Sequence, residues 1–345
     1  NINGVRVVRL KSPKTKDIGY VRRTINEFIM PFAMLRNLRK SPLAQDKWDG
    51  VVWYSPTIFL GPLANALKQA SGCRGYLILR DIFPEWAADM GLMGRGLPYR
   101  FFKTIANHQY SVANVIGVQT PGNLNFFRNM SSQQGRRVEV LQNWLTDTPE
   151  QGCSIKISDT PLAGRTIFVY AGNMGVAQGM GILLDLAEHL QNRNDLGFLF
   201  VGRGSDAQRL RNDAASRGLN NVVFYDEVDP NEIPGLYAQC HIGLVALDHR
   251  HKTHNIPGKF LSYMQAGLPV LACVNPNNDL VSLIETENIG RVCTDASAQT
   301  LKALAESLAA NLSHDTAYSS RCKALSARLF SPETAVKQIV EALHK

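Results

Sequence analysis

The sequence predicts an α/β fold of two doubly wound, Rossmann-like domains that face each other across a cleft. The chain has 345 residues, which is too long for one ordinary core and suits two domains of about 150–200 residues each. Short apolar segments alternate along it with helical patterns of about 10–15 residues, and this alternation indicates parallel sheets covered by helices on both faces. Hydrophobic residues make up 45% of the chain and charged residues 19%, as in a globular protein. No apolar run reaches the ~20 residues that span a bilayer.

The first half opens with an alternating segment, Gly4–Leu10, which predicts a short strand. Further strands are expected at Gly50–Tyr54, Arg74–Leu79, Val115–Val118 and Val138–Leu141, and helices at Leu60–Ala70 and Leu97–Ala113.

The second half repeats the alternation without repeating the sequence. Strands are expected at Thr166–Tyr170, Gly197–Val201, Val222–Phe224, Ile242–Val245 and Pro269–Ala272, and helices at Gly179–Gln191, Ala207–Arg217, Ile233–Gln239 and Phe260–Gln265.

A polar stretch with Thr, Asp, Pro and Gly, Asn143–Pro161, suits a linker between the two blocks. We therefore expect a first domain over residues 1–148 and a second over residues 149–330, with a C-terminal helix at residues 331–345 that rejoins the first. Ligands of open parallel sheets bind beyond the carboxyl ends of the strands. Candidate site residues are therefore sought at those ends.

The net positive charge of the chain comes entirely from its first half. Residues 1–150 carry 20 Lys and Arg against 10 Asp and Glu, whereas residues 151–345 carry 17 against 19. This asymmetry predicts a polyanionic partner for the first half. An anionic membrane surface suits it better than nucleic acid, because Tyr20–Lys40 mixes apolar and basic residues as an interfacial helix does. The alternative is an ordinary core-facing helix with a solvated basic face.

The six cysteines are scattered and form no C-x-x-C pair, so we expect reduced thiols of a cytosolic protein rather than disulfides or a zinc site. A run of three histidines, His249, His251 and His254, leaves a metal site to be weighed against a mobile donor-facing loop or a plain exposed loop. The interleaved Arg250 and Lys252 repel a cation, and no cysteine or well-placed carboxylate completes a ligand set. We expect no metal and no cofactor.

Several strand ends of the second block carry residues suited to an anionic ligand. The first strand runs into Gly172, Asn173 and Gly175, where glycines let backbone N–H groups approach an anion. The alternative is that this is an ordinary glycine-rich turn between a strand and a helix, without a ligand. The next strand ends in Gly202-Arg203-Gly204. A third strand leads into the acidic turn Tyr225-Asp226-Glu227-Val228, where the tyrosine ring could face a nucleobase.

The segment Asn255-Ile256-Pro257-Gly258-Lys259 precedes a predicted helix and is the strongest candidate. Pro and Gly open the helix, whose first N–H groups have no partner within it, and Lys adds a point charge. These features predict a seat for a diphosphate.

Together, the segments YAGNMG, FLFVGRGSDAQRL, NVVFYDEVDPNEIPGLYAQCHIGLVAL and IPGKFLSYMQAGLPVLA resemble the C-terminal domain of retaining glycosyltransferases of family 4, which have the glycosyltransferase B fold. In the first half WYSPTIFLGPLANAL, LRDIFPEWA and VIGVQTPGNLNFF resemble the acceptor domain of that family. The resemblance is greatest to bacterial O-antigen and capsule enzymes, including L-fucosamine transferases. It covers nearly the whole chain, with the first βα unit expected to be missing before Asn1.

The resemblance implies retaining transfer of a sugar, for example an N-acetylated amino sugar, from a UDP-sugar donor to an undecaprenyl-diphosphate-linked saccharide. It places the enzyme peripherally on the cytoplasmic membrane's inner face. It further implies donor contacts at Gly172, Asn173, Gly175, Arg203, Gly204, Tyr225, Val228, Asn255, Pro257, Gly258 and Lys259.

In the first half, Asp81 and Glu85 follow a strand and are expected to face the cleft as catalytic residues, Asp81 orienting or deprotonating the acceptor hydroxyl or holding the donor sugar. Tyr54, Ser55 and Arg80 are expected to bind the acceptor. The alternative is that Asp81 caps a turn and Glu85 is solvated.

The chain departs from the family pattern at four positions. Two glutamates that many members carry correspond to His254 and Ser262, and a frequent Arg and Lys correspond to Asn173 and Gln178. These departures shift neutralisation of the diphosphate onto Lys259, Arg203 and backbone N–H groups. They leave open a UDP-sugar epimerase or hydrolase on the same fold, or a non-catalytic sugar-nucleotide-binding protein. A dinucleotide oxidoreductase is disfavoured, because no G-x-G-x-x-G follows a strand with the required acidic residue.

Overall fold

The computed structural model describes residue 2 and residues 4–128, 136–149, 152–250, 252 and 254–344. It divides into two compact units, each an α/β structure. Unit 1 comprises residues 1–119, 123–141 and 337–345, and unit 2 comprises residues 120–122 and 142–336.

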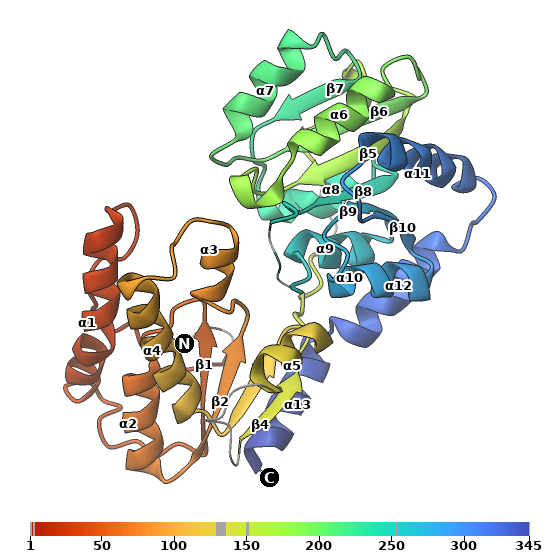
Figure 1. The fold of residues 1–345 in the computed structure, drawn as a ribbon. Helices are drawn as coiled ribbons and strands as arrows, with labels where there is room; N and C mark the ends of the chain where they lie inside the picture. The colour runs from red at the N-terminus through yellow and green to blue at the C-terminus, as the bar shows by residue number, and fades with distance from the viewer. Residues whose placement is uncertain are drawn as a thin grey trace. The chain divides into compact units, whose positions relative to one another are not determined.

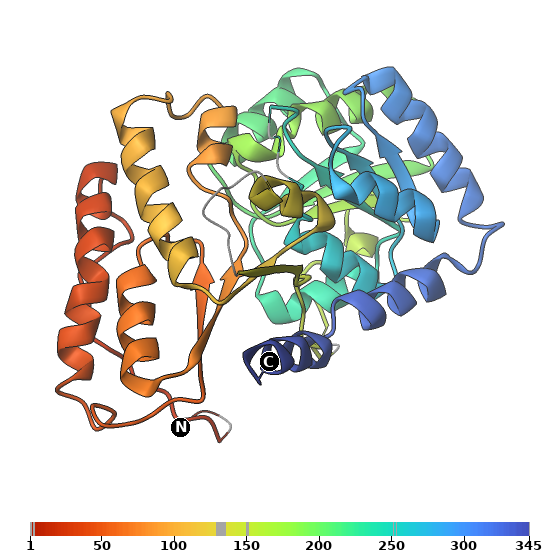
Figure 2. The ribbon, with the colours of Figure 1, turned by 60° about the horizontal axis from the view of Figure 1, so that its bottom comes forward.

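Unit 1 contains a parallel sheet in the order β1-β2-β3-β4 (Figure 1). Its strands are β1 (Gly50–Ser55), β2 (Arg74–Leu79), β3 (Val115–Val118) and β4 (Arg137–Val140), and its helices are α1 (Tyr20–Leu38), α2 (Gly61–Ser71), α3 (Glu85–Asp89), α4 (Leu97–Val112), most of α5 (Pro121–Arg128) and most of α13 (Pro332–His344). Helices α1 and α2 pack side by side (Figure 2). The last helix of the chain packs on this sheet, because Gln338 donates hydrogen bonds of 2.8 Å to Glu139 Oε1 and to Val140 O.

The strand predicted at Gly4–Leu10 is wrong. Over the described residues of this segment the only pairing is an isolated bridge between Ile2 and Val5. The alternating valines Val5, Val7 and Val8 are exposed. An alternating segment forms a strand only where a neighbouring strand accepts its hydrogen bonds, and none of the described strands does so here.

Unit 2 contains a six-stranded parallel sheet in the order β10-β9-β8-β5-β6-β7. Its strands are β5 (Thr166–Ala171), β6 (Leu196–Val201), β7 (Val222–Tyr225), β8 (Ile242–Ala246), β9 (Val270–Cys273) and β10 (Gly290–Cys293). Its α-helices are α6 (Gly181–His189), α7 (Ala207–Ser216), α8 (Ile233–Tyr237), α9 (Gly258–Ala266), α10 (Asp279–Glu287), α11 (Ala298–Asn311) and α12 (Tyr318–Leu329), and single 3-10 turns lie at Ile157–Asp159, Val176–Gln178 and Pro230–Glu232.

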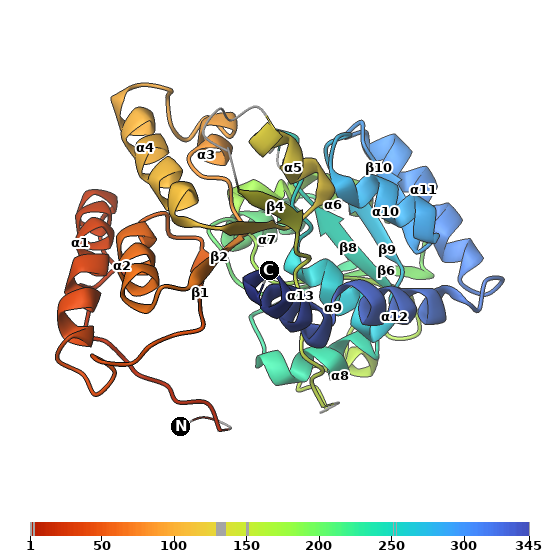
Figure 3. The same ribbon diagram turned by 90° about the horizontal axis from the view of Figure 1, so that it is seen from below.

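Both faces of this sheet are covered by helices. Alternate residues of β5 enter two separate apolar clusters: Val169 packs with α8, α9 and α12, whereas Phe168 and Tyr170 pack with α6, α7 and α11. Helices α9 and α12 lie side by side (Figure 3). The doubly wound arrangement predicted from the alternation of elements is therefore confirmed for this unit.

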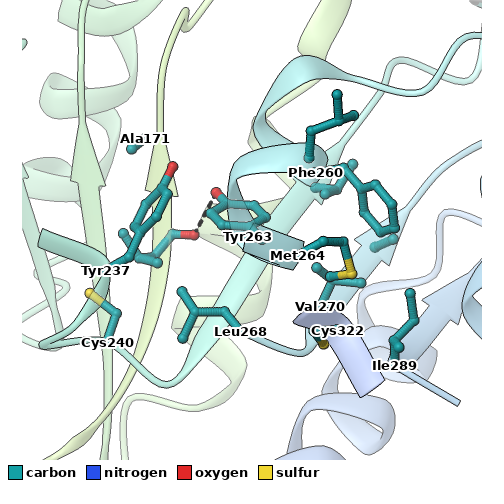
Figure 4. Packing of buried hydrophobic residues seen from close by; sticks show 14 of the residues in the cluster. Ala171, Tyr237, Cys240, Phe260, Tyr263, Met264, Leu268, Val270, Ile289 and Cys322 are labelled. Carbon is teal, nitrogen blue, oxygen red and sulfur yellow. Dashed lines mark hydrogen bonds between the residues drawn. The ribbon is translucent and has the colours of Figure 1, made fainter. Parts of the chain in front are cut away.

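The strand order reverses between β5 and β8. From β5 the chain continues to β6 and β7 on one side, and β8, β9 and β10 lie on the other. The ladder between β5 and β8 is short, with Phe168 opposite Ile242 and Val169 opposite Gly243. Tyr263 of α9, labelled in Figure 4, fills the opening. Its hydroxyl lies 3.0 Å from Val169 O and 3.2 Å from Leu244 O. Such a reversal is where open α/β sheets bind ligands.

Part of the expected linker, Asn143–Pro161, belongs to the core of unit 2. Ile155 and Ile157 are buried. Gln239 of the segment after α8 accepts a hydrogen bond from Ile157 N at 3.0 Å and donates one to Ile155 O at 3.0 Å. The polar composition of the stretch does not reveal these apolar anchors.

Candidate functional site

Two glycine-containing loops interlock at the carboxyl ends of β5 and β6. Met174 N donates to Arg203 O at 2.8 Å, and Gly172 N donates to Val201 O at 2.9 Å. A Cβ atom on Gly202 would lie 2.1 Å from Gly172 O, and one on Gly204 would lie 2.2 Å from Met174 O. Glycine is therefore required at both positions by the close approach of the two loops, and it keeps the loop after β5 in place.

A side chain that the family resemblance treated as a departure supports the same loop. Gln178 Oε1 accepts hydrogen bonds from Gly175 N at 3.0 Å and from Asn173 Nδ2 at 3.2 Å. Gly172 and Asn173 are exposed, whereas Gly175 is buried. The loop thus presents Gly172 and Asn173 to solvent on a backbone that Gln178 holds.

Helix α9 begins directly after Pro257, whose extended backbone (φ −62°, ψ 141°) forms the N-cap. Pro257 supplies no side-chain cap, and the first N–H groups of an α-helix have no acceptor within the helix. Gly258 is exposed here. The preceding loop is held by Asn278, whose Nδ2 donates to Asn255 O at 3.3 Å. The N-terminus of α9 is therefore an anion-binding feature on a fixed loop.

Lys259, the second residue of α9, reaches across the strand reversal to Tyr170. Its Nζ donates to Tyr170 Oη at 2.9 Å and lies 4.2 Å from the centroid of the tyrosine ring. Burial lowers the pKa of Lys259 to about 8, because a desolvated ammonium is less favourable than the neutral amine. The lysine is still mainly charged at neutral pH.

These elements enclose a cavity of about 300 Å³. It is lined by Ala171, Gly172, Asn173, Ile233, Tyr237, Lys259 and Ser262. Four of the predicted donor residues therefore lie in one place: Gly172, Asn173 and Lys259 line the cavity, and Gly258 adjoins Lys259 on the same helix end. The sequence reasoning missed Ile233, Tyr237 and the underlying Tyr170, which follow from the packing of α8 and α9 rather than from any local motif.

Other predicted donor residues lie outside the cavity lining. Arg203 is largely exposed and pairs with Glu227, with its Nε 2.8 Å from Oε2. Tyr225 and Val228 are half-buried against the core of unit 2, and Tyr225 O accepts the N–H of Gly202 at 3.2 Å. This group borders the loop after β6.

The histidine run is only partly described, because His251 and Thr253 lie outside the described residues. His249 Nε2 lies 3.8 Å from Cys273 Sγ, and Arg250 pairs with Asp248 at 2.7 Å. His254 Nδ1 lies 3.9 Å from Asp279 Oδ1. Over the described ranges of the chain, no three His, Cys, Asp or Glu side chains gather as metal ligands would.

In unit 1, the predicted residues Tyr54, Ser55, Arg80 and Asp81 lie at the carboxyl ends of β1 and β2. Ser55 stands opposite Leu79 in the sheet, and Arg80 N donates to Ser55 O at 3.3 Å. The Arg80 side chain is buried and donates to Leu141 O at 2.6 Å. Burial lowers its pKa to about 10, and the neighbouring Tyr54 and Asp81 oppose that shift. Tyr54 is exposed, whereas Ser55 is buried.

Glu85 opens α3 and is engaged with α4. It forms an ion pair with Lys103, and Tyr99 Oη donates to its Oε1 at 3.3 Å. Lys103 Nζ also lies 4.5 Å from the centroid of the Phe126 ring. Sequence spacing alone does not reveal this partner 18 residues away.

Helix α1 presents an apolar face to solvent. Its large exposed side chains are Tyr20, Val21, Ile25, Phe28, Ile29 and Phe32. Leu97 and Phe101 of α4 are also exposed, and the rings of Phe28 and Phe101 lie 6.3 Å apart. Across the described residues, no helix is long and apolar enough to span a membrane.

Residues 165–311 match the family model described as "Glycosyl transferases group 1". The matched range runs from just before β5 to the end of α11 and so contains the whole six-stranded sheet and the cavity. This part of unit 2 is therefore similar to the glycosyl transferases of group 1.

Two solved structures are similar over most of the chain. HepE of Anabaena, solved in complex with UDP-glucose, gives a TM-score of 0.67 at 18% identity over 91% of this chain and 81% of that one. Sucrose-phosphate synthase of Thermosynechococcus elongatus gives 0.72 at 13% identity over 97% and 81%. Likeness at these identities concerns the fold, and the protein has the glycosyltransferase B fold with its two α/β parts.

One curated relative is a protein of Escherichia coli K12 named as a colanic acid biosynthesis glycosyl transferase, WcaI, which is 25% identical over 277 residues. The alignment covers 73% of this chain and 64% of that protein. The chain thus spans slightly less than two thirds of the length of this relative.

Proposed function

We propose that the protein is a retaining glycosyltransferase that moves a sugar from a UDP-sugar to a lipid-linked saccharide during bacterial surface polysaccharide synthesis. The match of residues 165–311 to the group 1 family, the colanic acid assignment of the relative and the UDP-glucose complex of HepE support the class of reaction. The observation that carries the proposal is Lys259, which stands at a helix N-terminus that Pro257 does not cap and lines a cavity at the strand reversal of the sheet. An N-acetylated amino sugar is our candidate for the transferred group.

In this proposal the diphosphate of the donor binds at the N-terminus of α9. Lys259 Nζ and the N–H groups of Gly258 and Lys259 face its oxygens. Gly172 and Asn173 approach it from the loop after β5, and the predicted contact at Gly175 is reduced to support of that loop, because its N–H is bonded to Gln178. The cavity of about 300 Å³ is at the small end of the range for small-molecule sites. It therefore holds the diphosphate and sugar, and the uridine extends toward Arg203, Gly204, Tyr225 and Val228. Asn255 and Pro257 shape the loop that closes on the diphosphate.

The chemistry follows from charge that develops on the leaving UDP. As the bond from the anomeric carbon to the diphosphate oxygen breaks, negative charge accumulates on that oxygen, and preorganised donors stabilise the transition state more than the ground state. Lys259 and the helix end supply such donors, so we assign this role to them rather than to a metal. Asp81 is proposed to orient the acceptor hydroxyl, with Tyr54, Ser55 and Arg80 beside it. Glu85 stays a predicted catalytic residue, although its ion pair with Lys103 favours a positioning role.

A second candidate function is a sugar-nucleotide-binding protein without transferase activity. The residues His254 and Ser262 favour it, because many members of the resembled family carry glutamates there and Ser262 lines the cavity. A UDP-sugar epimerase or hydrolase is the other alternative. Incubation with UDP-sugars separates the three: transfer requires the acceptor, epimerisation or hydrolysis proceeds without it, and a binding protein leaves the sugar unchanged.

The partner of unit 1 is proposed to be an anionic membrane surface on the cytoplasmic side, where an undecaprenyl-diphosphate-linked acceptor would be reached. The excess of 20 basic over 10 acidic residues in residues 1–150 attracts such a surface. The exposed apolar face of α1, with Leu97 and Phe101 of α4, supplies side chains for insertion at the interface.

The experiment that tests the donor site is Lys259→Ala with UDP binding measured by calorimetry. Loss of a charge-assisted hydrogen bond is worth about 1.5–3 kcal/mol, so the Kd for UDP should rise about 10- to 100-fold. Lys323→Ala is the matched control, because Lys323 is an exposed lysine of α12 that does not line the cavity. Equal UDP affinity in wild type and Lys259→Ala would remove the diphosphate from this site.

A further inference from the structure

Lys259 is a half-buried residue whose ammonium is desolvated and whose surroundings in the described structure are neutral. The groups that face it are Tyr170 of β5, Tyr237 of α8, Ser262 of α9 and Asn173 of the loop after β5. Desolvation is the whole cause of its lowered pKa, with no contribution from an acidic neighbour. A buried charge is unfavourable unless it is paired. We therefore expect a bound anion to supply the negative charge that pairs with the Lys259 ammonium.

Tyr170 is oriented so that it can only accept from this lysine. Its hydroxyl donates its one proton to Asn173 O at 2.7 Å, which leaves the oxygen lone pairs toward Lys259 Nζ at 2.9 Å. The ring is fully buried, in the cluster that packs α6 and α7, and burial raises the pKa of this phenol far above neutrality. Tyr170 therefore stays a neutral acceptor at any working pH.

Both contacts also restrict where the lysine can point. The long lysine side chain has many rotamers, and ordering it costs about 1.5–2 kcal/mol of entropy. The ring of Tyr170 4.2 Å away and its hydroxyl select one orientation before any ligand arrives. An ammonium has three N–H donors, so one bond to Tyr170 leaves two for a ligand.

We propose that Tyr170 is a positioning residue that holds the ammonium of Lys259 ready for the donor diphosphate, and that diphosphate binding is linked to protonation of this lysine. This inference rests on the donor site proposed above. The phenol does not touch the reacting atoms in this account and acts through Lys259 and through the carbonyl of Asn173.

The linkage has a definite sign. Lys259 has a pKa of about 8 in the free protein, so it is charged below that pH and neutral above it, whereas the phosphates of UDP are fully ionised above pH ~7 because their last pKa is about 6. If the diphosphate binds only the ammonium form, affinity changes little just above pH 7 and falls about tenfold per pH unit above pH 8. Between pH 7 and pH 9 the Kd of UDP should rise about tenfold.

The test measures the Kd of UDP by calorimetry from pH 6.5 to 9.5 for wild type, Tyr170→Phe and Lys259→Arg. Tyr170→Phe keeps the ring and loses the acceptor, so at pH 7 the Kd should rise about three- to tenfold, and the midpoint of the alkaline decline should move to lower pH. Lys259→Arg should show no decline up to pH 9.5, because a guanidinium stays charged. Tyr318→Phe is the control, since Tyr318 is a buried tyrosine with Arg321 4.6 Å from its ring centroid but lies outside the cavity lining.

Proton uptake on binding gives a second readout that a purely structural role would not move. At pH 9, calorimetry in two buffers of different ionisation enthalpy should show uptake of about 0.9 proton by wild type and none by Lys259→Arg. A wild-type midpoint and affinity in Tyr170→Phe, or an unchanged alkaline decline in Lys259→Arg, would overturn the inference. Should Tyr170→Phe fail to fold, the Lys259→Arg measurements still decide whether UDP binding is linked to protonation of Lys259. These outcomes differ from failure of the donor site itself, which Lys259→Ala reports by unaltered UDP affinity at pH 7.

Discussion

The joint between Tyr263 and Gly243 is expected to control both the stability of unit 2 and the geometry of its site. The Tyr263 ring lies directly on Gly243, where a Cβ atom would be 2.5 Å from ring atoms Cγ and Cδ2. The ring is fully buried, and its hydroxyl reaches carbonyls of both β5 and β8. Two substitutions perturb this joint from opposite sides, one by removing the hydroxyl and one by adding a methyl group.

Tyr263→Phe leaves at least one buried carbonyl without its donor, which costs about 1–3 kcal/mol. Gly243→Ala brings a methyl group about 1 Å closer to the ring than ordinary contact allows, and overpacking of this kind costs about 1–3 kcal/mol. Since the ring is the obstacle, Gly243→Ala should cost less in a Tyr263→Leu background than in wild type. For a unit of this size each kcal/mol lowers Tm by about 2–4 °C, so each single variant should unfold roughly 2–12 °C below wild type.

Thermal unfolding followed by near-ultraviolet circular dichroism measures this effect, and hydrogen exchange of peptides from β5 and β8 assigns it to unit 2. Tyr318→Phe controls for the loss of a buried tyrosine hydroxyl elsewhere in the same unit. The reasoning is refuted if Tyr263→Phe matches wild type in Tm, or if Gly243→Ala costs the same in both backgrounds. The first result would mean that the hydroxyl is dispensable, and the second that the methyl group meets something other than the ring.

Two further predictions concern catalysis and the membrane. Asp81→Asn should reduce sugar transfer by about 10²-fold or more, as expected for a lost general base or orienting carboxylate, with the Kd for UDP unchanged; full activity in this variant would remove Asp81 from the mechanism. Liposome sedimentation should show binding that rises with anionic lipid and falls with salt. The double variant Ile25→Glu with Phe32→Glu should weaken this binding about tenfold or more. Val336→Glu is the control and should leave it unchanged, because Val336 is an exposed apolar residue of unit 2. Equal binding to neutral vesicles, or an unaffected pair variant, would contradict the membrane role.

Much of unit 2 could be predicted from the sequence because its signals are local. The apolar runs at β5, β6 and β8 are short and bounded by glycine and polar residues, and the predicted bounds of each differ from the observed ones by one residue. The Pro257-Gly258-Lys259 segment marks a helix start by the same local rule, and α9 begins at Gly258. The fold class followed from these elements and from their order.

What the sequence did not reveal depends on contacts between distant segments. Tyr170 and Lys259 are 89 positions apart, and no local pattern indicates that a tyrosine at the end of a buried strand accepts from a lysine on α9. The same holds for Glu85, whose partner Lys103 lies on the next long helix. The wrong strand at Gly4–Leu10 has the converse cause, since its alternating pattern is local but its pairing partner is not among the described strands.

Helix α9 links the two kinds of information, because one face of it serves both the fold and the site. Residues three and four positions apart lie on the same face of a helix, and Lys259, Ser262 and Tyr263 have this spacing. Lys259 and Ser262 line the cavity, whereas Tyr263 occupies the opening between β5 and β8. The tyrosine can fill this opening only because Gly243 lacks a side chain. A strand reversal offers a ligand site in any open α/β sheet. Here Tyr263 of α9 separates β5 from β8 at the reversal, and Lys259 of the same helix supplies the cation of the site.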